Sequence, residues 1–441
     1  MSKTPIFDFL KKYSESDPSR LHMPGHKGRG RLGCERYDIT EIHGADSLFE
    51  ADGIIRDSEK NLSDIYETRA SFYSTEGSSL CIRAMIFMAM QYSSGRKKIL
   101  AGRNAHKTLL SALSLCDLDA DWLFGEDLYS CRITPEELDT KLQSDEYFAV
   151  YVTNPDYLGN MIHLKSLADV CHNHGIPLLV DNAHGAYLKF TGQHPMDNGA
   201  DMCCDSAHKT LSCLTGSAYL HVSKNAIRPY EKDAKRALSL FASTSPSYLI
   251  MASMDLMNQK MSDGYEHKIR EASMLVDELK TSLSHLGFEF SGREKLKINI
   301  KPKSVGFTGE NLGSLMEKSG LYPEFCDQDN LVLMFSADTS RQDFAKITSF
   351  FSALGKKCPI TSNPPSLPKL YKAMSVREAM FSPSETVDVS GCVGRILASP
   401  CVSCPPAIPI AVCGEVLDEA AVECFGYYGV KEINVIKLAG N

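Results

Sequence analysis

The chain has 441 residues, of which 43% are hydrophobic and 23% charged, and its formal net charge is −8. This length allows two or three domains with a sizeable core, and the composition is that of a soluble globular protein. The negative net charge disfavours nucleic acid and anionic membranes as partners. No apolar run reaches about 18 residues, and the N-terminus lacks a signal peptide's apolar core. We therefore expect a cytoplasmic protein whose 15 cysteines are reduced.

The first half of the chain predicts an arm followed by a large α/β domain. Residues 1–60 are polar and irregular, with Gly and Pro interrupting the loop 21–28, and we expect them to form an N-terminal arm. From 61 to 250, short apolar runs alternate with helix-like stretches, which predicts βαβ units and a mostly parallel sheet. The expected strands are 99–101, 148–152, 176–180, 202–204 and 218–222, and a crossover helix is expected at 164–173.

The second half predicts smaller domains. Residues 249–286 carry apolar side chains at helical spacing, which favours one long helix that links two domains. Strands expected at 297–300 and 331–335 belong to a small α/β domain, which together with that helix covers 251–360. Pro and Ser are frequent in 359–368, as is typical of a linker, and a C-terminal domain is expected at 369–441.

Two residues at predicted strand ends suggest the chemistry. Asp181 follows the apolar run 176–180, and Lys209 lies in the polar turn 206–210 after the run 202–204. Open α/β sheets bind ligands at the carboxyl ends of their strands. A lysine can hold an aldehyde cofactor as a Schiff base, and an aspartate can keep a pyridine nitrogen protonated, as pyridoxal phosphate (PLP) requires. Taken alone, each has an ordinary interpretation: Asp181 as a turn or cap residue, Lys209 as a solvated side chain.

Further loops carry residues that suit such a cofactor. Residues 75–79 precede an apolar helix at 80–90, where small residues can bind an anion or merely form a Ser N-cap. His106 follows the strand 99–101, where its ring could stack on a pyridine or simply be hydrogen-bonded at the surface. Residues 153–159 lie at another strand end. The combination of these loops favours a functional site over separate accidents.

Several motifs extend this pattern along the chain. They are HMPGHKG at 22–28, DITE at 38–41, GAD at 44–46, RNAHK at 103–107, DNAHGA at 181–186, SAHKTL at 206–211, STSPSY at 243–248, YPEF at 322–325, PPAIP at 405–409 and GE at 414–415. With them the chain resembles, over nearly its whole length, the PLP-dependent fold-type-I decarboxylases of ornithine, lysine and arginine. The resemblance implies an aspartate aminotransferase-like α/β large domain with a mostly parallel seven-stranded sheet, plus smaller α/β C-terminal domains. The length is similar to the short form that lacks an N-terminal wing domain.

The resemblance also implies roles for individual residues. Lys209 matches the Schiff-base lysine, Asp181 the partner of the pyridine nitrogen, and His106 the histidine that stacks on the ring. The phosphate contacts and the rest of the cofactor loop are implied for Gly77, Ser78, Ser79, His184, Ser206 and His208. Thr244 or Ser245 matches a phosphate contact from a neighbouring subunit, which implies a homodimer with shared active sites. Whether dimers assemble further is left open.

The implied reaction is decarboxylation of arginine, lysine or ornithine to agmatine, cadaverine or putrescine, a step of polyamine biosynthesis. His208 and Lys209 are both candidates to reprotonate Cα. Glu324, Asp327 and Glu415 are candidates to bind the substrate's distal cation, although each could instead be a structural or solvent-facing carboxylate. Departures from the family pattern, including Cys213–Gly216 and Asn182, leave the substrate open.

Two other interpretations remain at this point. Another fold-type-I enzyme, such as an aminotransferase or a lyase, would fit the cofactor residues. An aminotransferase normally needs a late arginine for the substrate carboxylate, and Arg377 and Arg395 are available. A non-catalytic regulatory homologue is the second alternative, disfavoured by the intact Lys209 and Asp181. We predict no metal site, because the CxxC at 401–404 has no second pair at zinc-binding spacing.

Overall fold

The computed structural model describes residues 3–438, except 126, 145, 356 and 404–407. The chain forms two compact units that alternate along the sequence. The first unit comprises Met1–Arg96, Leu142–Tyr151 and Leu164–Ile269, and the second comprises Lys97–Lys141, Val152–His163 and Arg270–Asn441.

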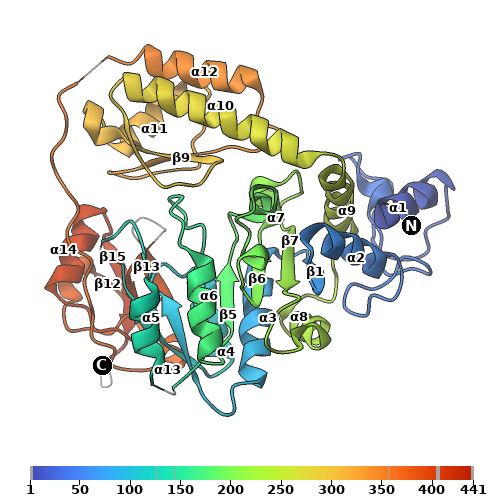
Figure 1. Cartoon of the computed structure of the whole chain (residues 1–441), viewed down its shortest axis with the longest axis horizontal. Helices are drawn as coiled ribbons and strands as arrows, with labels where there is room; N and C mark the ends of the chain where they lie inside the picture. The colour runs from blue at the N-terminus through green and yellow to red at the C-terminus, as the bar shows by residue number, and fades with distance from the viewer. Residues whose placement is uncertain (1–2, 126, 145, 356, 404–407, 439–441) are drawn as a thin grey trace. The chain divides into compact units, whose positions relative to one another are not determined.

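A seven-stranded sheet has the order β1-β7-β6-β5-β4-β2-β3. Its neighbouring strands β1, β7, β6 and β5 are labelled in Figure 1. Its strands are β1 (Ala70–Ser74), β2 (Lys98–Gly102), β3 (Asp119–Leu123), β4 (Tyr147–Thr153), β5 (Leu178–Asp181), β6 (Met202–Asp205) and β7 (Ala218–Val222). Strand β5 is parallel to β6 and β2 is parallel to β3, whereas β7 runs antiparallel to both β1 and β6. The predicted mostly parallel seven-stranded sheet is therefore confirmed. The sequence pattern missed β1 and β3, because serines and aspartates interrupt their apolar character.

The central strands form because their sequences are apolar on both faces. All residues of β5 and β6 are buried, as expected where a sheet is covered on both sides. The predicted crossover helix is confirmed as α6 (Leu164–Asn173), which buries Leu164, Leu167, Ala168 and Cys171 at helical spacing. It ends before Gly175, whose φ of +67° suits glycine, and the N–H of Ile176 closes the last turn by donating to the carbonyl of Cys171.

Helices of the first unit pack on this sheet and on one another. They are α1 (Pro5–Glu15), α2 (Ile54–Tyr66), α3 (Gly77–Gln91), α7 (Ala207–Thr210), α8 (Ala234–Phe241) and α9 (Tyr248–Ser262), besides α6. Helix α3 contacts α8, β6 and β7, and both α1 and α2 contact α9. The expectation of an irregular arm was wrong at α1, whose Ile6 and Leu10 are buried. In the first turn of α1, the N–H groups of Ile6 and Phe7 donate hydrogen bonds to the buried carboxylate of Asp255.

The single long helix predicted for 249–286 is also wrong, because the structure has two helices there. Helix α9 ends at Ser262, and α10 begins at Tyr265 and ends at His285. Between them, Gly264 has a φ of +76°, in the left-handed region that glycine adopts at little cost. Hydrophobic spacing alone did not predict this break.

The second unit contains smaller sheets. A four-stranded antiparallel sheet has the order β10-β11-β9-β8, and its β9 and β11 confirm the two strands predicted for the small domain. The remaining strands are β8 (Glu289–Ser291), β9 (Lys297–Lys301), β10 (Phe325–Cys326), β11 (Leu331–Met334), β12 (Ser384–Asp388), β13 (Cys401–Ser403), β14 (Pro409–Val412) and β15 (Glu432–Ile436). Its other helices are α4 (Lys107–Leu115), α5 (Pro135–Leu142), α11 (Gly309–Lys318), α12 (Arg341–Ser352), α13 (Val376–Phe381) and α14 (Glu419–Tyr427).

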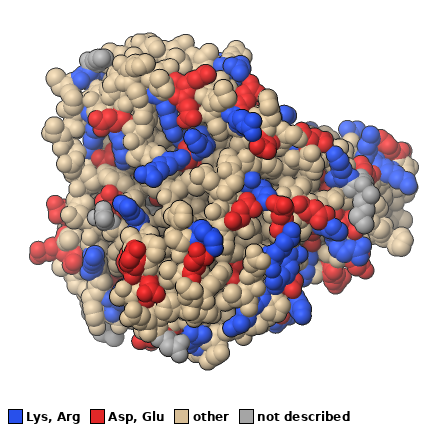
Figure 2. All heavy atoms as spheres, in the orientation of Figure 1, with Lys and Arg blue, Asp and Glu red and all other residues tan. Residues whose placement is uncertain are grey.

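Positive and negative side chains are intermingled over the face that Figure 2 shows, so the net charge of −8 does not appear there as one acidic field. In the described part of the chain, no helix combines the length and the apolar character that a bilayer crossing requires.

Candidate active site

Asp181 is the last residue of β5, and its buried carboxylate is held by neutral donors. Tyr151, on β4, donates its hydroxyl hydrogen to Oδ2 at 3.1 Å, and the N–H of Ala183 donates to Oδ1 at 3.1 Å. Burial and the neighbouring Asp181 raise the pKa of the Cys204 thiol, which therefore keeps its hydrogen and donates to Oδ1 at 3.7 Å. Among the described residues, no cationic side chain pairs with this carboxylate.

Lys209 lies in the short helix α7, which follows the end of β6. Its Nζ is 3.0 Å from Nε2 of His184, a buried residue in the loop that follows Asp181. The preceding residue, His208, places Nδ1 2.8 Å from the carbonyl oxygen of Ser217. Because a carbonyl only accepts, Nδ1 of His208 carries a hydrogen, and Nε2 is the nitrogen left for acid–base chemistry.

The residues predicted to bind the phosphate group lie at and around the start of α3. The hydroxyl of Ser206 donates to that of Ser78 at 2.8 Å, which joins the Lys209 turn to this helix. Gly77 has a φ of +71°, and its N–H donates to the carbonyl of Gly216 at 2.8 Å. A Cβ at Gly216 would lie 2.9 Å from the carbonyl oxygen of Thr75, so glycine allows this close approach. The dipole of α3 favours an anion beside these hydroxyls.

These residues fit PLP. A buried carboxylate without a cationic partner is costly, and a protonated pyridine nitrogen would provide the missing charge. Serine hydroxyls at a helix start provide donors for a phosphate group. A lysine amine lies at the neighbouring strand end. The fit therefore rests on the charge and donor pattern of Asp181, Ser78, Ser206 and Lys209, all of the first unit.

His106 belongs to the second unit, where it precedes α4 in the chain. Its Nδ1 accepts from the N–H of Thr108 and lies 2.8 Å from the hydroxyl of Thr108, so the side chain caps the helix. The residue is exposed. The cap fixes the orientation of the imidazole, as a stacking role would need.

Thr244 and Ser245 are exposed in the loop before α9. The adjacent Ser243 donates its N–H to the carboxylate of Glu76, the residue before α3, at 2.7 Å. The loop thus lies next to the phosphate residues of its own chain, while the predicted contact from a neighbouring subunit stays a prediction.

Glu415 differs from the expected substrate-binding carboxylate. Its two oxygens accept from Nη1 and Nη2 of Arg103 at 2.7 and 2.8 Å, and the N–H of Val412 donates at 2.8 Å. Arg103 is 0% and Glu415 2% exposed. This buried and paired carboxylate serves the packing of the second unit and is not accessible to a substrate cation.

The other two candidates have different environments. Asp327 is buried, which raises its pKa, and it accepts from the N–H groups of Asp329 and Asn330 in a turn. Glu324 is exposed and accepts from the Tyr157 hydroxyl at 3.0 Å. Of the three, Glu324 has the accessible carboxylate.

The two arginines considered for an aminotransferase are already occupied. Arg377 donates to the carbonyl of Ser114 at 2.6 Å, and Arg395 forms an ion pair with Glu385 at 2.6 Å. Residues 405–407 of the Pro-rich motif and Cys404 of the CxxC lie outside the described residues.

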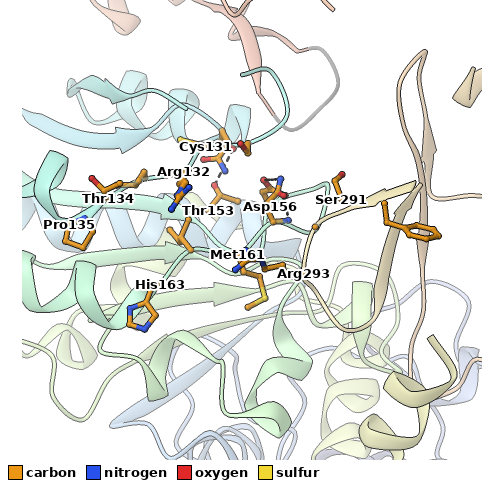
Figure 3. Close-up of a pocket in the computed structure, with 17 residues that line it drawn as sticks. Cys131, Arg132, Thr134, Pro135, Thr153, Asp156, Met161, His163, Ser291 and Arg293 are labelled. Atoms are coloured by element: carbon orange, nitrogen blue, oxygen red, sulfur yellow. Dashed lines mark hydrogen bonds between the residues drawn. The ribbon is translucent and has the colours of Figure 1, made fainter. Parts of the chain in front are cut away.

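A cavity of about 590 Å³ lies in the second unit (Figure 3). The ends of β2 and β4 contribute Asn104, Thr153 and Asp156 to its wall, and exposed Arg132 and Arg293 line it as well. Burial raises the pKa of Asp156 to about 6, but three donors from Leu158 and Asn160 already bind its carboxylate. Thr153 and Asp156 belong to the loop 153–159 that the sequence had suggested, but no residue with a predicted catalytic, cofactor or substrate role lines this cavity. Its volume alone is therefore no guide to the chemistry.

Sequence reasoning missed Tyr151 and Cys204, the side chains that donate to Asp181. Both lie on neighbouring strands that the pattern had placed, but each was treated only as an apolar core residue. Tyrosine inside a buried strand normally needs a hydrogen-bond partner, and that requirement was the available signal.

The chain is similar to several known proteins. A family model described as Orn/Lys/Arg decarboxylase, major domain, matches residues 4–282. The chain is similar to an arginine decarboxylase of Halalkalibacterium halodurans, with 28% identity over 95% of this chain and 92% of that protein. It is also similar to the crystal structure of a lysine decarboxylase of Francisella novicida, with a TM-score of 0.78, 17% identity, and coverage of 98% of this chain and 81% of that one.

A structure of SPT with PLP has a TM-score of 0.52 and 15% identity, with coverage of 68% of this chain and 75% of that one. The structural likenesses confirm the predicted fold class. The family model covers more than half of the sequence and includes every strand of the seven-stranded sheet. The chain belongs to the Orn/Lys/Arg decarboxylase family.

Proposed function

We propose that this chain is a PLP-dependent decarboxylase that removes the α-carboxyl group of a basic amino acid as CO₂. The observation that carries the proposal is the buried carboxylate of Asp181, which has neutral donors but no cationic partner among the described residues. In a chain of this family, such a carboxylate suits a protonated pyridine nitrogen. Lys209, at the next strand end, supplies the amine.

When bound, PLP supplies an aldehyde that condenses with amines and a pyridine ring that withdraws the electron pair left on Cα when CO₂ departs. Asp181 would hold the proton at the ring nitrogen, and its burial would strengthen this charge interaction by excluding water. Ser78, Ser206 and the start of α3 would bind the phosphate. The family resemblance implies that His106 would be the residue that stacks on the ring.

Two residues are candidates to return a proton to the substrate Cα. His208 can carry a proton on Nε2, because its Nδ1 is engaged with Ser217. Lys209 can exchange a proton with His184 across 3.0 Å. A His208→Gln variant separates them: slower deuterium incorporation at Cα in heavy water supports His208, and an unchanged rate supports Lys209.

For the substrate, we propose arginine, with agmatine as a precursor for polyamine biosynthesis. The support is the arginine decarboxylase of H. halodurans, which matches nearly the whole chain. Glu324 is the carboxylate that we propose for the guanidinium, because it is exposed whereas Asp327 and Glu415 are buried.

The experiment is incubation of the purified holoenzyme with arginine, lysine and ornithine, with detection of CO₂ and the amine. One amine with an equal amount of CO₂ supports the proposal, whereas a keto acid would identify an aminotransferase. A protein that binds no PLP would favour the regulatory alternative. In the Lys209→Ala control we expect no turnover and no visible absorbance from lysine-bound cofactor.

We further propose a homodimer in which Thr244 or Ser245 reaches the phosphate of the partner subunit. The test mixes Lys209→Ala protein with a Thr244→Ala/Ser245→Ala double variant, after each has been shown to be inactive. Recovery of activity on mixing supports a shared site. If sedimentation shows dimers but mixing restores nothing, the loop serves its own chain, next to Glu76.

A further inference from the structure

A buried cluster of the first unit, outside the residues assigned above, adjoins the two strand ends that carry Asp181 and Lys209. It consists of His194, Asp205 and His221, each 0% exposed, and we call it the Asp205 cluster. Asp205 Oδ2 lies 3.0 Å from Nε2 of His194 and 3.3 Å from Nε2 of His221. Asp205 Oδ1 accepts from the side-chain amide of Asn182 at 2.6 Å. Both carboxylate oxygens are thus engaged.

The two imidazoles are themselves held in place. His221 Nδ1 lies 2.7 Å from the hydroxyl of Ser71, on β1. The ring of Tyr66 stacks on His221 at 4.4 Å between centroids and meets His194 edge-on at 5.0 Å. The Tyr66 hydroxyl donates to the carbonyl of Ala186, in the loop that follows Asp181. The two imidazoles that face Asp205 are therefore fixed in position by their own neighbours.

The hydrogen-bond pattern favours a hydrogen-bonded cluster over a metal site, although three potential ligand atoms converge. The N–H of Met196 donates to Nδ1 of His194, so this nitrogen has no hydrogen. In the neutral ring, Nε2 carries the hydrogen and donates it to Asp205. A metal-bound histidine instead donates a hydrogen from its other nitrogen, which this geometry does not allow.

The cluster joins two short segments of the chain. Asp205 ends β6 and is followed directly by the turn of Ser206 and Lys209, while Asn182 follows Asp181. The side-chain bond from Asn182 to Asp205 is reinforced by the backbone bond from the N–H of Asn182 to the carbonyl of Cys204, at 3.0 Å. These bonds set the relative position of the two strand ends.

We propose that Asp205 is a positioning residue of the decarboxylase site, which sets the spacing between Asp181 and Lys209. It acts through the two buried imidazoles and through Asn182, without touching the cofactor itself. The proposal rests on the proposed function, because the spacing affects catalysis only where both residues serve one bound cofactor. Small displacements of reacting groups have large kinetic effects.

The test compares Asp205→Asn with Asp201→Asn, a matched control in the same protein. Asp201 is also 0% exposed, adjoins the other end of β6, and binds the N–H of Leu178 at the start of β5. In Asp205→Asn only one side-chain oxygen remains, so it cannot accept from both Asn182 and the Nε2–H of His194, and the cluster loses one of its two acceptors together with the negative charge. Both variants are expected to lower the unfolding temperature.

Only Asp205→Asn is expected to change the site. In the holoenzyme, kcat should fall about ten- to a hundredfold with KM nearly unchanged. The pH at which the visible absorbance of the lysine-bound cofactor changes should also shift. Equal behaviour of the two variants in both readouts would overturn the proposal, as would a full equivalent of bound metal in the purified wild type.

A third readout separates this proposal from the proposed function. In protein stripped of PLP, amide exchange of residues 206–211 should accelerate in Asp205→Asn but not in Asp201→Asn. If that difference appears in a protein without decarboxylase activity, the proposed function fails and the positioning role stands. If Asp205→Asn does not fold, Asn182→Ala replaces it, since it breaks the same connection and keeps the charge. Unchanged exchange in Asn182→Ala would then contradict the proposal.

Discussion

Strand β6 has a fully buried aspartate at each end, and the two carboxylates bind different kinds of partners. Asp201, just before the strand, accepts from the N–H groups of Leu178 and Ile227 at 2.8 Å and lies 2.9 Å from Nε2 of His172. Asp205, at the other end, binds side chains of three separate segments. Backbone partners of the first kind stabilise the sheet, whereas the second set ties together the segments that carry Asp181 and Lys209. Residue type and burial alone therefore do not separate the two roles.

Glu415 is a third buried carboxylate that can be compared with these two. Its substitution is expected to cause the largest loss of stability. Glu415→Gln leaves the guanidinium of Arg103 buried without its counter-charge, and we expect the free energy of unfolding to fall by about 3–5 kcal/mol. Denaturant unfolding measures this change. The control Glu385→Gln removes the more exposed partner of Arg395 and should cost no more than about 1 kcal/mol. A higher KM with unchanged stability in Glu415→Gln would instead favour the original substrate-binding role.

At the carboxyl end of β5, Asp181→Asn should affect catalysis far more than stability. The asparagine can still accept from Tyr151, but it cannot hold a proton at the ring nitrogen. We expect kcat to fall by about 10²–10³-fold, which corresponds to about 3–4 kcal/mol of barrier. Steady-state kinetics beside thermal unfolding separates the two effects. Retention of full activity would remove the central observation of the proposed function.

A smaller effect, on the affinity for PLP, is expected from substitution of a residue proposed to bind the phosphate. Ser78→Ala removes the acceptor of the Ser206 hydroxyl and one donor for the phosphate, at a cost of about 1 kcal/mol. The affinity for PLP should fall about five- to tenfold in an absorbance titration. Ser284→Ala, at an exposed position of α10, is the control and should bind PLP like the wild type.

The smallest expected effect is a pH dependence of opposite sign at the two ends of β6. The hydrogen bond to Asp201 raises the pKa of His172, so its contribution is complete below about pH 6.5 and is lost as pH rises through the raised pKa. Because His172 is partly exposed, this contribution should be less than about 1 kcal/mol. Burial lowers the pKa of His221, although Asp205 opposes the shift, so this group reduces stability as pH falls below about 6.5.

Unfolding free energies between about pH 5 and 8 test both signs. His172→Gln should remove the part of the stability that declines with rising pH, and His221→Gln should remove the part that declines with falling pH. Identical pH profiles for the two variants would contradict the assignment of opposite roles.

Local sequence patterns were sufficient to predict most strands of the seven-stranded sheet and the chemically suitable residues at their ends. Apolar runs predicted β2 and β4 to β7, and the spacing of Leu164 to Cys171 predicted α6, because burial on one or both faces leaves a periodic trace in the sequence. The polar residues just after those runs, Asp181 and Lys209, followed from the rule that ligands bind at strand ends. The break at Gly264 and the short helix α1 were not predicted, since a glycine and a polar stretch are compatible with several backbone conformations.

The sequence by itself thus determined the family, the strands at the centre of the large sheet and the chemically suitable residues at their ends. Only the tertiary structure decided which carboxylates are already paired. Glu415 meets Arg103 across 312 residues of chain, and Asp205 collects partners from the loops and strands around it. The physical reason is that a hydrogen-bond partner from a distant segment leaves no periodic signal, because it is set by how the segments pack.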